Sequence, residues 1–458
     1  MDESLRAETR LLRNVSPPDA LPGAIVASKS RSNPDYYYHW VRDSGIAVRA
    51  LLSLYQTAGT LALRQRALVP LVQFVDFSRH IQRTAIHQGI GLGEPKFTVD
   101  GAPYAGLWAR PQNDGPAIRA IELTRLALTL LDEGEVALVR DRLYDGKLPT
   151  DSVIKADLEY VAHHGRETCF DVWEEVRGHH FFTQHLERRA LLEGAALARK
   201  LGDTGAASFY REQARLLEPG LRRYWQPGQA YITATLDADP APSPLRSGLD
   251  SAVIIATLGG YCMDDGLHEE HLYPVNHEGV LQTTLALERL FADTYPINAR
   301  SRLIPGVAIG RYPEDRYDGY RTDSLGNPWP SITIAFAMFY YKLAGRYRML
   351  GSIAVTAGNL DFLQHLTGRE GNSPVPGEDL AAGEPAFEEI LTALRARGDT
   401  FLLRVRHHLG AEGSMAEQMN RFTGFQQGAA DLTMGYAAFL LAVEARRTVR
   451  SMEPSPGR

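Results

Sequence analysis

Apolar residues recur along most of the chain at intervals of three and four, the spacing that places them on one face of an α-helix. In the last such segment Leu432, Tyr436, Phe439, Leu440 and Val443 share a face. The same spacing predicts twelve helices, over residues 42–57, 63–86, 115–131, 151–165, 182–200, 204–219, 249–258, 280–293, 328–343, 350–366, 385–408 and 428–446. Strand-like stretches are short, as at residues 230–236, so the chain is expected to be all-α.

The connections between these helices are unusually long. Twelve helices in 458 residues leave about 38 residues for each helix with its connection, whereas typical helices of ~11 to 12 residues are joined by ~4 to 6. The excess lies in loops rich in Gly, Pro, Tyr, Trp and charge, at residues 23–41, 88–115, 165–181, 225–248, 297–328 and 409–428. Such loops on a helical scaffold are where binding sites lie. Periodicity alone leaves open whether the helical hairpins form a ring or a stack.

No Pro/Ser-rich linker divides the chain, which predicts a single main domain over residues 23–450. Residues 1–22 are expected to be an N-terminal segment and residues 451–458 a disordered tail. The first residues lack an apolar signal region, which favours a cytoplasmic location unless a leader has been removed.

Charge and composition exclude several functional classes. The 49 Lys and Arg against 55 Asp and Glu give a net charge of −6, and nucleic-acid binders instead carry a basic stripe. No apolar run approaches the ~18 to 20 residues of a membrane helix. The two cysteines, Cys169 and Cys262, allow at most one disulfide, and free thiols are expected. No CxxC zinc motif occurs.

Aromatic rings and charged groups gather in four loop segments, at residues 33–43, 91–116, 169–176 and 310–329. Four of the five tryptophans lie there: Trp40, Trp108, Trp173 and Trp329. A sugar ring offers an apolar face that an aromatic plane covers, while its hydroxyls bond to Arg, Asp and Glu. The pattern therefore favours a carbohydrate site. The alternative is that the tryptophans only anchor the loops to the core.

Glycosidic cleavage needs one carboxyl group that donates a proton and one that stays ionised. Glu174 and Glu175 are adjacent and flanked by Trp173 and Val176, so mutual repulsion is expected to keep one of them protonated. The alternative is a solvated helix face. Glu417, in a glycine-bounded loop before the last helix, is the candidate partner.

Together these segments resemble the catalytic domain of glucoamylases, glycoside hydrolase family 15. The resemblance runs in order through Gly23–Ser28 with Asn33–Gly45, Gly91–Arg119, Phe170–Phe182, Gly310–Trp329 and Ala416–Ala438. Glu-Pro-Lys-Phe and Arg-Pro-Gln-x-Asp-Gly-Pro are its most specific motifs. It implies an (α/α)6 barrel and an inverting exo-hydrolase that releases β-glucose from non-reducing ends.

The resemblance also implies residue roles. It makes Glu174 the general acid and Glu417 the general base. Glu175 and Arg311 would contact the +1 sugar, while Arg42 and Asp43 would bind the outer hydroxyls of the terminal glucose. Tyr36 would lie near the scissile bond and Trp108 would pack on the substrate, while Asp171, Trp173 and Trp329 would shape the pocket. Trp40 is also expected to bind substrate, and Asp171 to have a supporting role. Arg110, Gln112, Asp114 and Asp315 fall in matching motifs with supporting roles.

The chain departs from the family pattern near its end. The family has Leu-Thr-Trp-Ser-Tyr where this chain has Leu432-Thr-Met434-Gly435-Tyr436, which changes the pocket wall. The cysteine pattern, linker and starch-binding module of fungal members and the N-terminal β-sandwich of bacterial ones are not found, so binding to raw starch granules is not expected.

Several alternatives stay open. A family member could prefer α-1,6-linked glucans or trehalose, or could bind carbohydrate without cleaving it. A metal site at His268 and His271 with His277 lacks the HExxH spacing, and Gly91-Leu-Gly93 lacks a third glycine for a nucleotide loop. The chain is therefore expected to need no cofactor or metal, and to act as a monomer on an oligo- or polysaccharide.

Overall fold

The computed structural model of the chain describes residues 3–89, 91–241, 245–260, 271–300, 304–368 and 374–453. Its longer helices are α1 (Glu3–Arg13), α2 (Val41–Gln56), α3 (Leu61–His87), α4 (Asp114–Asp132), α6 (Val153–His164), α7 (Phe181–Lys200), α8 (Thr204–Leu221), α9 (Ala252–Gly260), α10 (Glu278–Thr294), α12 (Pro330–Leu350), α13 (Leu360–Thr367), α14 (Pro385–His408) and α15 (Thr433–Ser451). Short turns form α5 (Val136–Leu138) and α11 (Pro296–Arg300).

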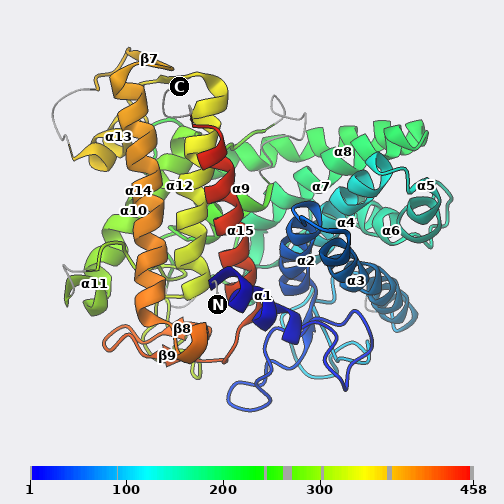
Figure 1. The fold of residues 1–458 in the computed structure, drawn as a ribbon. Helices are drawn as coiled ribbons and strands as arrows, with labels where there is room; N and C mark the ends of the chain where they lie inside the picture. The colour runs from blue at the N-terminus through cyan, green and yellow to red at the C-terminus, as the bar shows by residue number, and fades with distance from the viewer. Residues whose placement is uncertain are drawn as a thin grey trace.

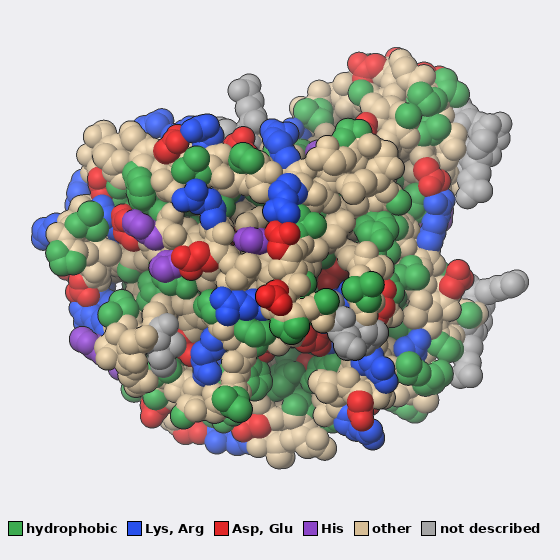
Figure 2. Space-filling view, turned by 180° about the vertical axis from the view of Figure 1, so that it is seen from behind, with side chains coloured by type: hydrophobic (Ala, Val, Ile, Leu, Met, Phe, Trp, Pro, Cys, Tyr) green, Lys and Arg blue, Asp and Glu red, His purple; other side chains and the backbone are tan. Residues whose placement is uncertain are grey.

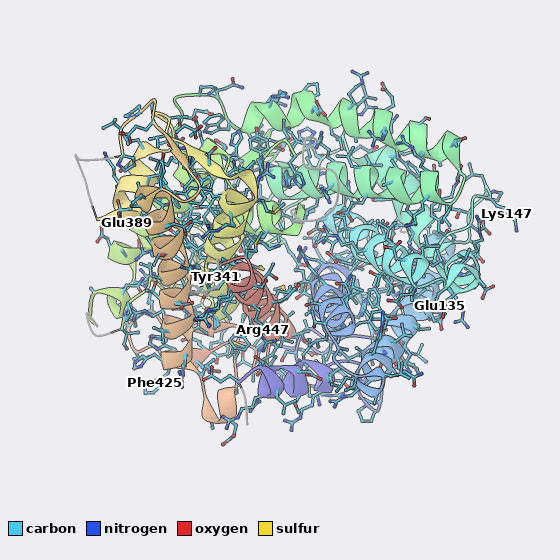
Figure 3. The ribbon with its side chains drawn as sticks, turned by 45° about the horizontal axis from the view of Figure 1, so that its top comes forward. Glu135, Lys147, Tyr341, Glu389, Phe425 and Arg447 are labelled. Atoms are coloured by element: carbon cyan, nitrogen blue, oxygen red, sulfur yellow. The ribbon has the colours of Figure 1, made fainter. Side chains whose placement is uncertain are left out.

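Within the described residues six helices close a ring, because α2 contacts α4, α4 contacts α7, and so on through α9, α12 and α15 back to α2. Helices α3, α6, α8, α10, α14 and α1 pack on the outside of this ring, and Figure 3 shows the helices arranged around a common centre. This alternation of inner and outer helices confirms the (α/α)6 barrel. The helical hairpins therefore form a ring and not a stack.

The helix that completes the set of twelve in the barrel is α1, and not the helix that the apolar spacing predicts at residues 350–366. Helix α1 packs on α15, so the first and last helices of the chain lie side by side, blue beside red in Figure 1. It buries Ala7 and Leu11, one helical turn apart, and Asn14 just after it donates to the Thr433 hydroxyl at 2.8 Å. The residues of α1 were expected to belong to an N-terminal segment, and no helix was predicted there.

The predicted helix at 350–366 is only partly correct. Gly351, with φ 73°, ends α12, and residues Ser352–Ala354 form strand β6, which pairs with β7 (Asp379–Ala381). Only Leu360–Thr367 is helical, as α13, which lies outside the barrel against α14. Gly351, in the left-handed conformation, ends the helix here, although the apolar spacing in the sequence continues beyond it.

Inner helices differ from outer ones in how much of their surface is buried. Helix α12 buries apolar residues on all sides, from Ile332 to Tyr347, as expected of a helix inside a large protein. Helix α8 buries only one face, including Tyr210 and Leu217. The ring is therefore a packed scaffold whose rigid helix ends carry the loops.

Short strands form antiparallel pairs in the loops between the helices. Strand β1 (His39–Trp40) pairs with β2 (Lys96–Phe97), and β3 (Cys169–Phe170) with β4 (Arg177–His180) and β5 (Thr235–Leu236). Strand β8 (Gln418–Met419) pairs with β9 (Gln426–Gln427). The β1–β2 pair joins the loops before α2 and α4, the β3–β4–β5 sheet joins the loops before α7 and α9, and the β8–β9 pair lies within the loop before α15.

The surface carries both charges interspersed, and a recess with acidic and hydrophobic walls opens on the face that Figure 2 shows. Among the described residues, no helix is long and apolar enough to cross a membrane. No cluster of metal-binding side chains occurs in the same ranges, and His268 lies outside them. Cys169 is a buried free thiol whose pKa burial raises, and Cys262 lies outside the described residues.

Candidate active site

The loops at the N-terminal ends of the inner helices surround a pocket of about 520 Å³, within the ~300 to 1,000 Å³ of typical ligand sites. It brings together the eleven residues expected to be catalytic or to bind substrate: Tyr36, Trp40, Arg42, Asp43, Trp108, Trp173, Glu174, Glu175, Arg311, Trp329 and Glu417. All four tryptophans singled out in the sequence line it. They are therefore part of the site and do not merely anchor the loops.

Glu174 lies in the turn after β3 and is held by four donors. Its Oε1 accepts hydrogen bonds from Trp40 Nε1 (3.0 Å), Arg42 Nη2 (3.1 Å) and Gln112 Nε2 (3.1 Å). Its Oε2 accepts one from Trp108 Nε1 at 2.9 Å. The backbone of Glu174 has φ 65°, a left-handed conformation that is costly for a residue with a Cβ and is found mostly at functional sites.

The neighbouring Glu175 has a separate set of partners. Arg311 Nη2 lies 3.0 Å from its Oε1, and Arg246 and Tyr312 bond to its Oε2. Although adjacent in sequence, the two carboxylates are each paired with different cations. The environment of Glu174 is thus set by its four donors, and the repulsion invoked from the sequence is not its main feature.

Glu417 lies in the loop before α15, immediately ahead of β8, and is buried, with 1% of its surface exposed. Its carboxylate accepts hydrogen bonds from Tyr36 (2.8 Å) and from Tyr317 (3.1 Å). Burial raises the pKa of Glu417 to about 7, although the two tyrosine hydroxyls favour its ionised form. A carboxyl group that titrates near neutrality is suited to proton transfer.

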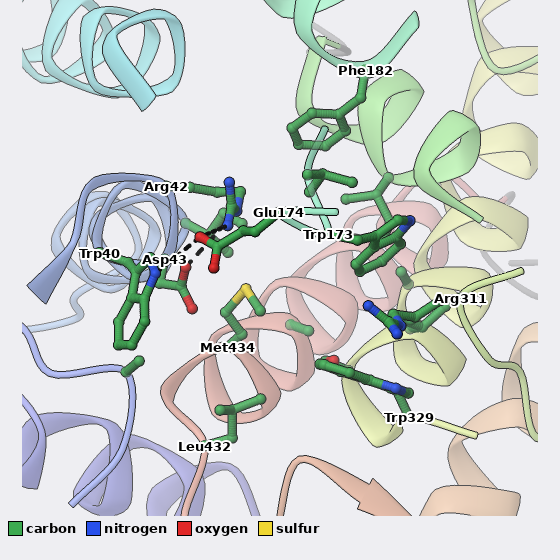
Figure 4. A pocket seen from close by; sticks show the side chains of 18 of the residues that line it. Trp40, Arg42, Asp43, Trp173, Glu174, Phe182, Arg311, Trp329, Leu432 and Met434 are labelled. Carbon is green, nitrogen blue, oxygen red and sulfur yellow. Dashed lines mark hydrogen bonds and ion pairs between the residues drawn. The ribbon is translucent and has the colours of Figure 1, made fainter. Parts of the chain in front are cut away.

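Arg42 and Asp43 form the first turn of α2 and point into the pocket from the same wall as Trp40 (Figure 4). Arg42 Nη1 donates to Asp114 Oδ2 and to Gln112 Oε1, both at 2.8 Å. These bonds fix the guanidinium, which explains why Asp114 and Gln112 fall in matching motifs although neither lines the pocket. Burial raises the pKa of Asp43 to about 6.

Trp173, Trp329 and Arg311 form the facing wall in Figure 4. Trp173 Nε1 donates to Asp250 Oδ2 at 2.9 Å, and the Arg311 guanidinium lies 5.4 Å from the Trp173 ring centroid. Arg311 Nε donates to Asp315 Oδ2 at 2.9 Å, so Asp315 holds the arginine from outside the pocket.

Asp171 and Arg110 lie behind the pocket walls. Asp171 Oδ1 accepts the backbone N–H groups of Glu175 (2.6 Å) and Val176 (2.9 Å), which shapes the turn that carries Glu174. Arg110 donates to Glu94 and to the Tyr104 carbonyl (2.6 Å), which shapes the loop before Trp108. The contacts of both residues are with protein groups, and through these contacts both shape the loops around the pocket.

Met434 lies on the pocket floor, where the family has an indole. Ala438 and Leu441, one and two turns further along α15, continue the lining, so the cavity extends between the inner helices below Met434. The departure noted in the sequence is thus in the site itself.

Sequence reasoning missed three residues. Tyr317 binds Glu417 and lies inside the Gly310–Trp329 segment, yet it was assigned no role. Asp250 accepts from Trp173 through a loop that no motif marked. Lys96 lies in the Glu-Pro-Lys-Phe motif and faces the rings around Glu174, yet it was assigned no role.

Comparison with known proteins identifies the family of the chain. A sequence model described as "Glycosyl hydrolases family 15" matches residues 7–444. The chain is 34% identical to a glucoamylase of Blastobotrys adeninivorans, over 98% of this chain and 71% of that protein. It is also 34% identical to Glucoamylase 1 of Rhizopus oryzae, over 95% of this chain and 68% of that protein.

Solved structures show the same relationship. The glucoamylase of Saccharomycopsis fibuligera superposes with a TM-score of 0.88 at 33% identity, over 98% of this chain and 95% of that one. A more distant structure, "Glycosidase Wild Type", has a TM-score of 0.58 at 15% identity and shows only that the fold is shared. With its sequence matched from residue 7 to 444, the chain belongs to glycoside hydrolase family 15.

Proposed function

We propose that the protein is an exo-acting α-glucosidase that cleaves α-1,4 bonds, and α-1,6 bonds more slowly, at the non-reducing ends of α-glucans and releases β-glucose. The observation that carries this proposal is the pair Glu174 and Glu417, two carboxyl groups that line one pocket and are held by separate sets of side chains. A binding protein without activity would not need both.

Glu174 is the general acid in this proposal. Its Oε1 already accepts three N–H groups, so the transferable proton lies on Oε2. As the glycosidic C–O bond breaks, this proton moves to the leaving oxygen and Glu174 becomes a carboxylate. The indole N–H of Trp108 bonds to the same Oε2 and stabilises the charge that forms there.

Glu417 is the general base. Ionised, it takes a proton from a water molecule while that water's oxygen bonds to the anomeric carbon, on the face opposite the leaving group. The configuration therefore inverts. Tyr36 and Tyr317 orient the carboxylate, since each hydroxyl donates to it.

Exo action is supported by the charged side chains at one wall of the pocket. Arg42 and Asp43 offer a fixed donor and acceptor to the outer hydroxyls, which are free only on the last sugar of a chain. Arg311 and Glu175 lie further out, where the +1 sugar would bind. One chain supplies every one of these residues, which supports action as a monomer.

Product analysis on maltohexaose tests the proposed function. We expect glucose and maltopentaose to be the only products during the first tenth of the reaction, because Arg42 and Asp43 would bind hydroxyls that are free only on the terminal sugar. Maltose and maltotriose at the earliest times would show internal cleavage. Trehalose hydrolysed faster than maltose would instead assign the alternative linkage.

A further inference from the structure

Lys96 has an environment that the reaction as described above does not use. It lies on β2 opposite Trp40 of β1 and has only 3% of its surface exposed. Its ammonium faces four aromatic rings, with Nζ 3.6 Å from the ring centroid of Trp108, 4.1 Å from Tyr104, 4.2 Å from Tyr38 and 4.4 Å from Trp40. Across the part of the chain that the structure describes, no oxygen lies within hydrogen-bond or ion-pair distance of Nζ.

An aromatic face attracts a cation, so a cage of rings can hold an ammonium that has lost its water. The rings also pack on one another, with Tyr38 on Tyr104 (5.3 Å between centroids), Tyr104 on Trp108 (5.6 Å) and Trp40 on Trp108 (5.9 Å). Burial lowers the pKa of Lys96 to about 8, so the side chain is charged at neutral pH. The cage therefore contains a fixed positive charge.

Two of the caging rings bind Glu174. Trp40 Nε1 donates to Oε1 at 3.0 Å and Trp108 Nε1 donates to Oε2 at 2.9 Å, so each indole contacts both Lys96 and one carboxylate oxygen. The charge of Glu174 favours the charged form of Lys96, and the attraction is mutual.

The indole of Trp108 depends most on this cage. Trp40 is buried within β1 and is fixed by its strand. Trp108 lies in a loop where its neighbour Leu107 is 99% exposed, so contacts of the ring itself must hold the indole in place. Besides the hydrogen bond from its Nε1 to Glu174, the indole contacts the charged Lys96 Nζ, which lies 3.6 Å from the ring centroid.

We propose that Lys96 is a positioning residue for Glu174. It acts through the indoles of Trp40 and Trp108, which it holds so that their N–H groups donate to the two oxygens of Glu174. Its positive charge also favours loss of the proton from Oε2. The inference rests on the proposed function, since it assigns Lys96 to the acid of that mechanism. The competing explanation is that Lys96 only fills space and stabilises the fold.

Lys96→Met tests the inference, because methionine has a similar length and no charge. We expect kcat to fall about 30-fold with KM changed less than about threefold, since the interaction serves proton transfer more than binding. The basic limb of the pH–rate profile should move to higher pH by about half a unit or more, because loss of the cation leaves the proton more tightly held. The other charged groups facing Lys96 are Glu94, Asp35 and Arg110, and all remain in this variant.

Two further measurements separate positioning from packing. Lys96→Arg keeps the cation and should recover at least a third of the lost kcat. In a Trp108→Phe background, Lys96→Met should lower kcat by less than about threefold, since coupled residues are not additive. Tryptophan fluorescence should change in Lys96→Met and stay unchanged in Lys147→Met, whose side chain is 86% exposed.

A Lys96→Met enzyme with unchanged kcat and pH profile would overturn the inference, as would equal losses with and without Trp108. If Lys96→Met does not fold, Lys96→Arg and Lys96→Gln in the same assays decide the question. Full activity in a Glu174→Gln enzyme would instead contradict the proposed function itself.

Discussion

Replacement of Glu174 by Gln should lower kcat about 10⁴-fold, a loss of about 5 kcal/mol of transition-state stabilisation. The amide keeps the shape of the side chain but has no proton that it can give to the glycosidic oxygen. Part of its hydrogen bonding survives, because its carbonyl oxygen can still accept from Trp40, Arg42 and Gln112. Substrate should therefore still bind, and KM should change much less than kcat.

Steady-state kinetics of this variant on maltose and on 4-nitrophenyl α-glucoside would show whether Glu174 acts by donating a proton. The nitrophenolate leaving group needs little protonation, so it should be cleaved with a smaller loss than maltose if Glu174 is the acid. The control is Glu135→Gln, because Glu135 is exposed, lies at the edge of the molecule in Figure 3 and does not line the pocket. Equal losses on both substrates would argue against proton donation by Glu174.

The second large effect is expected for Glu417→Gln, which should lower kcat by about 10³-fold because the water loses its proton acceptor. In the unmodified enzyme kcat/KM should fall as the pH drops through about 7, the pKa of Glu417, since the base must be ionised to act. The residual activity of the variant should lack this acid limb. Below pH 6 the two enzymes should therefore differ less than they do at pH 8.

Glu412→Gln is the matched control, because Glu412 lies in the same loop with its side chain 76% exposed. This variant should keep both the rate and the acid limb of the unmodified enzyme. An acid limb that persists in Glu417→Gln would assign the titration to another group, with Asp43 as the next candidate because burial raises its pKa to about 6.

Most of the barrel helices were predictable from the sequence because the inner and outer helices each carry apolar residues at helical spacing, whereas their closure into a ring was implied only by the family resemblance. The bounds of α2, α7 and α14 lie close to those predicted, since their ends coincide with the ends of the apolar pattern. Helix α1 was missed because it has few apolar residues, and its burial depends on α15, which is more than 400 residues away in sequence.

The pocket was predictable because aromatic and charged residues gather in a few loops. What the sequence could not show is how their side chains pair. Glu174 and Glu175 are neighbours in sequence, yet one is bound by two indoles and the other by Arg311 and Arg246. Tyr317 joins Glu417 only because separate loops meet at the end of the barrel.

The central claim is that Glu174 and Glu417 act on opposite faces of one anomeric carbon and so invert its configuration. The anomer of freshly released glucose tests this most directly, measured by proton NMR during the first minutes of maltopentaose hydrolysis, before mutarotation. We expect β-glucose to appear first and to decay slowly to the equilibrium mixture. Initial α-glucose would contradict both the mechanism and the pairing of these two residues.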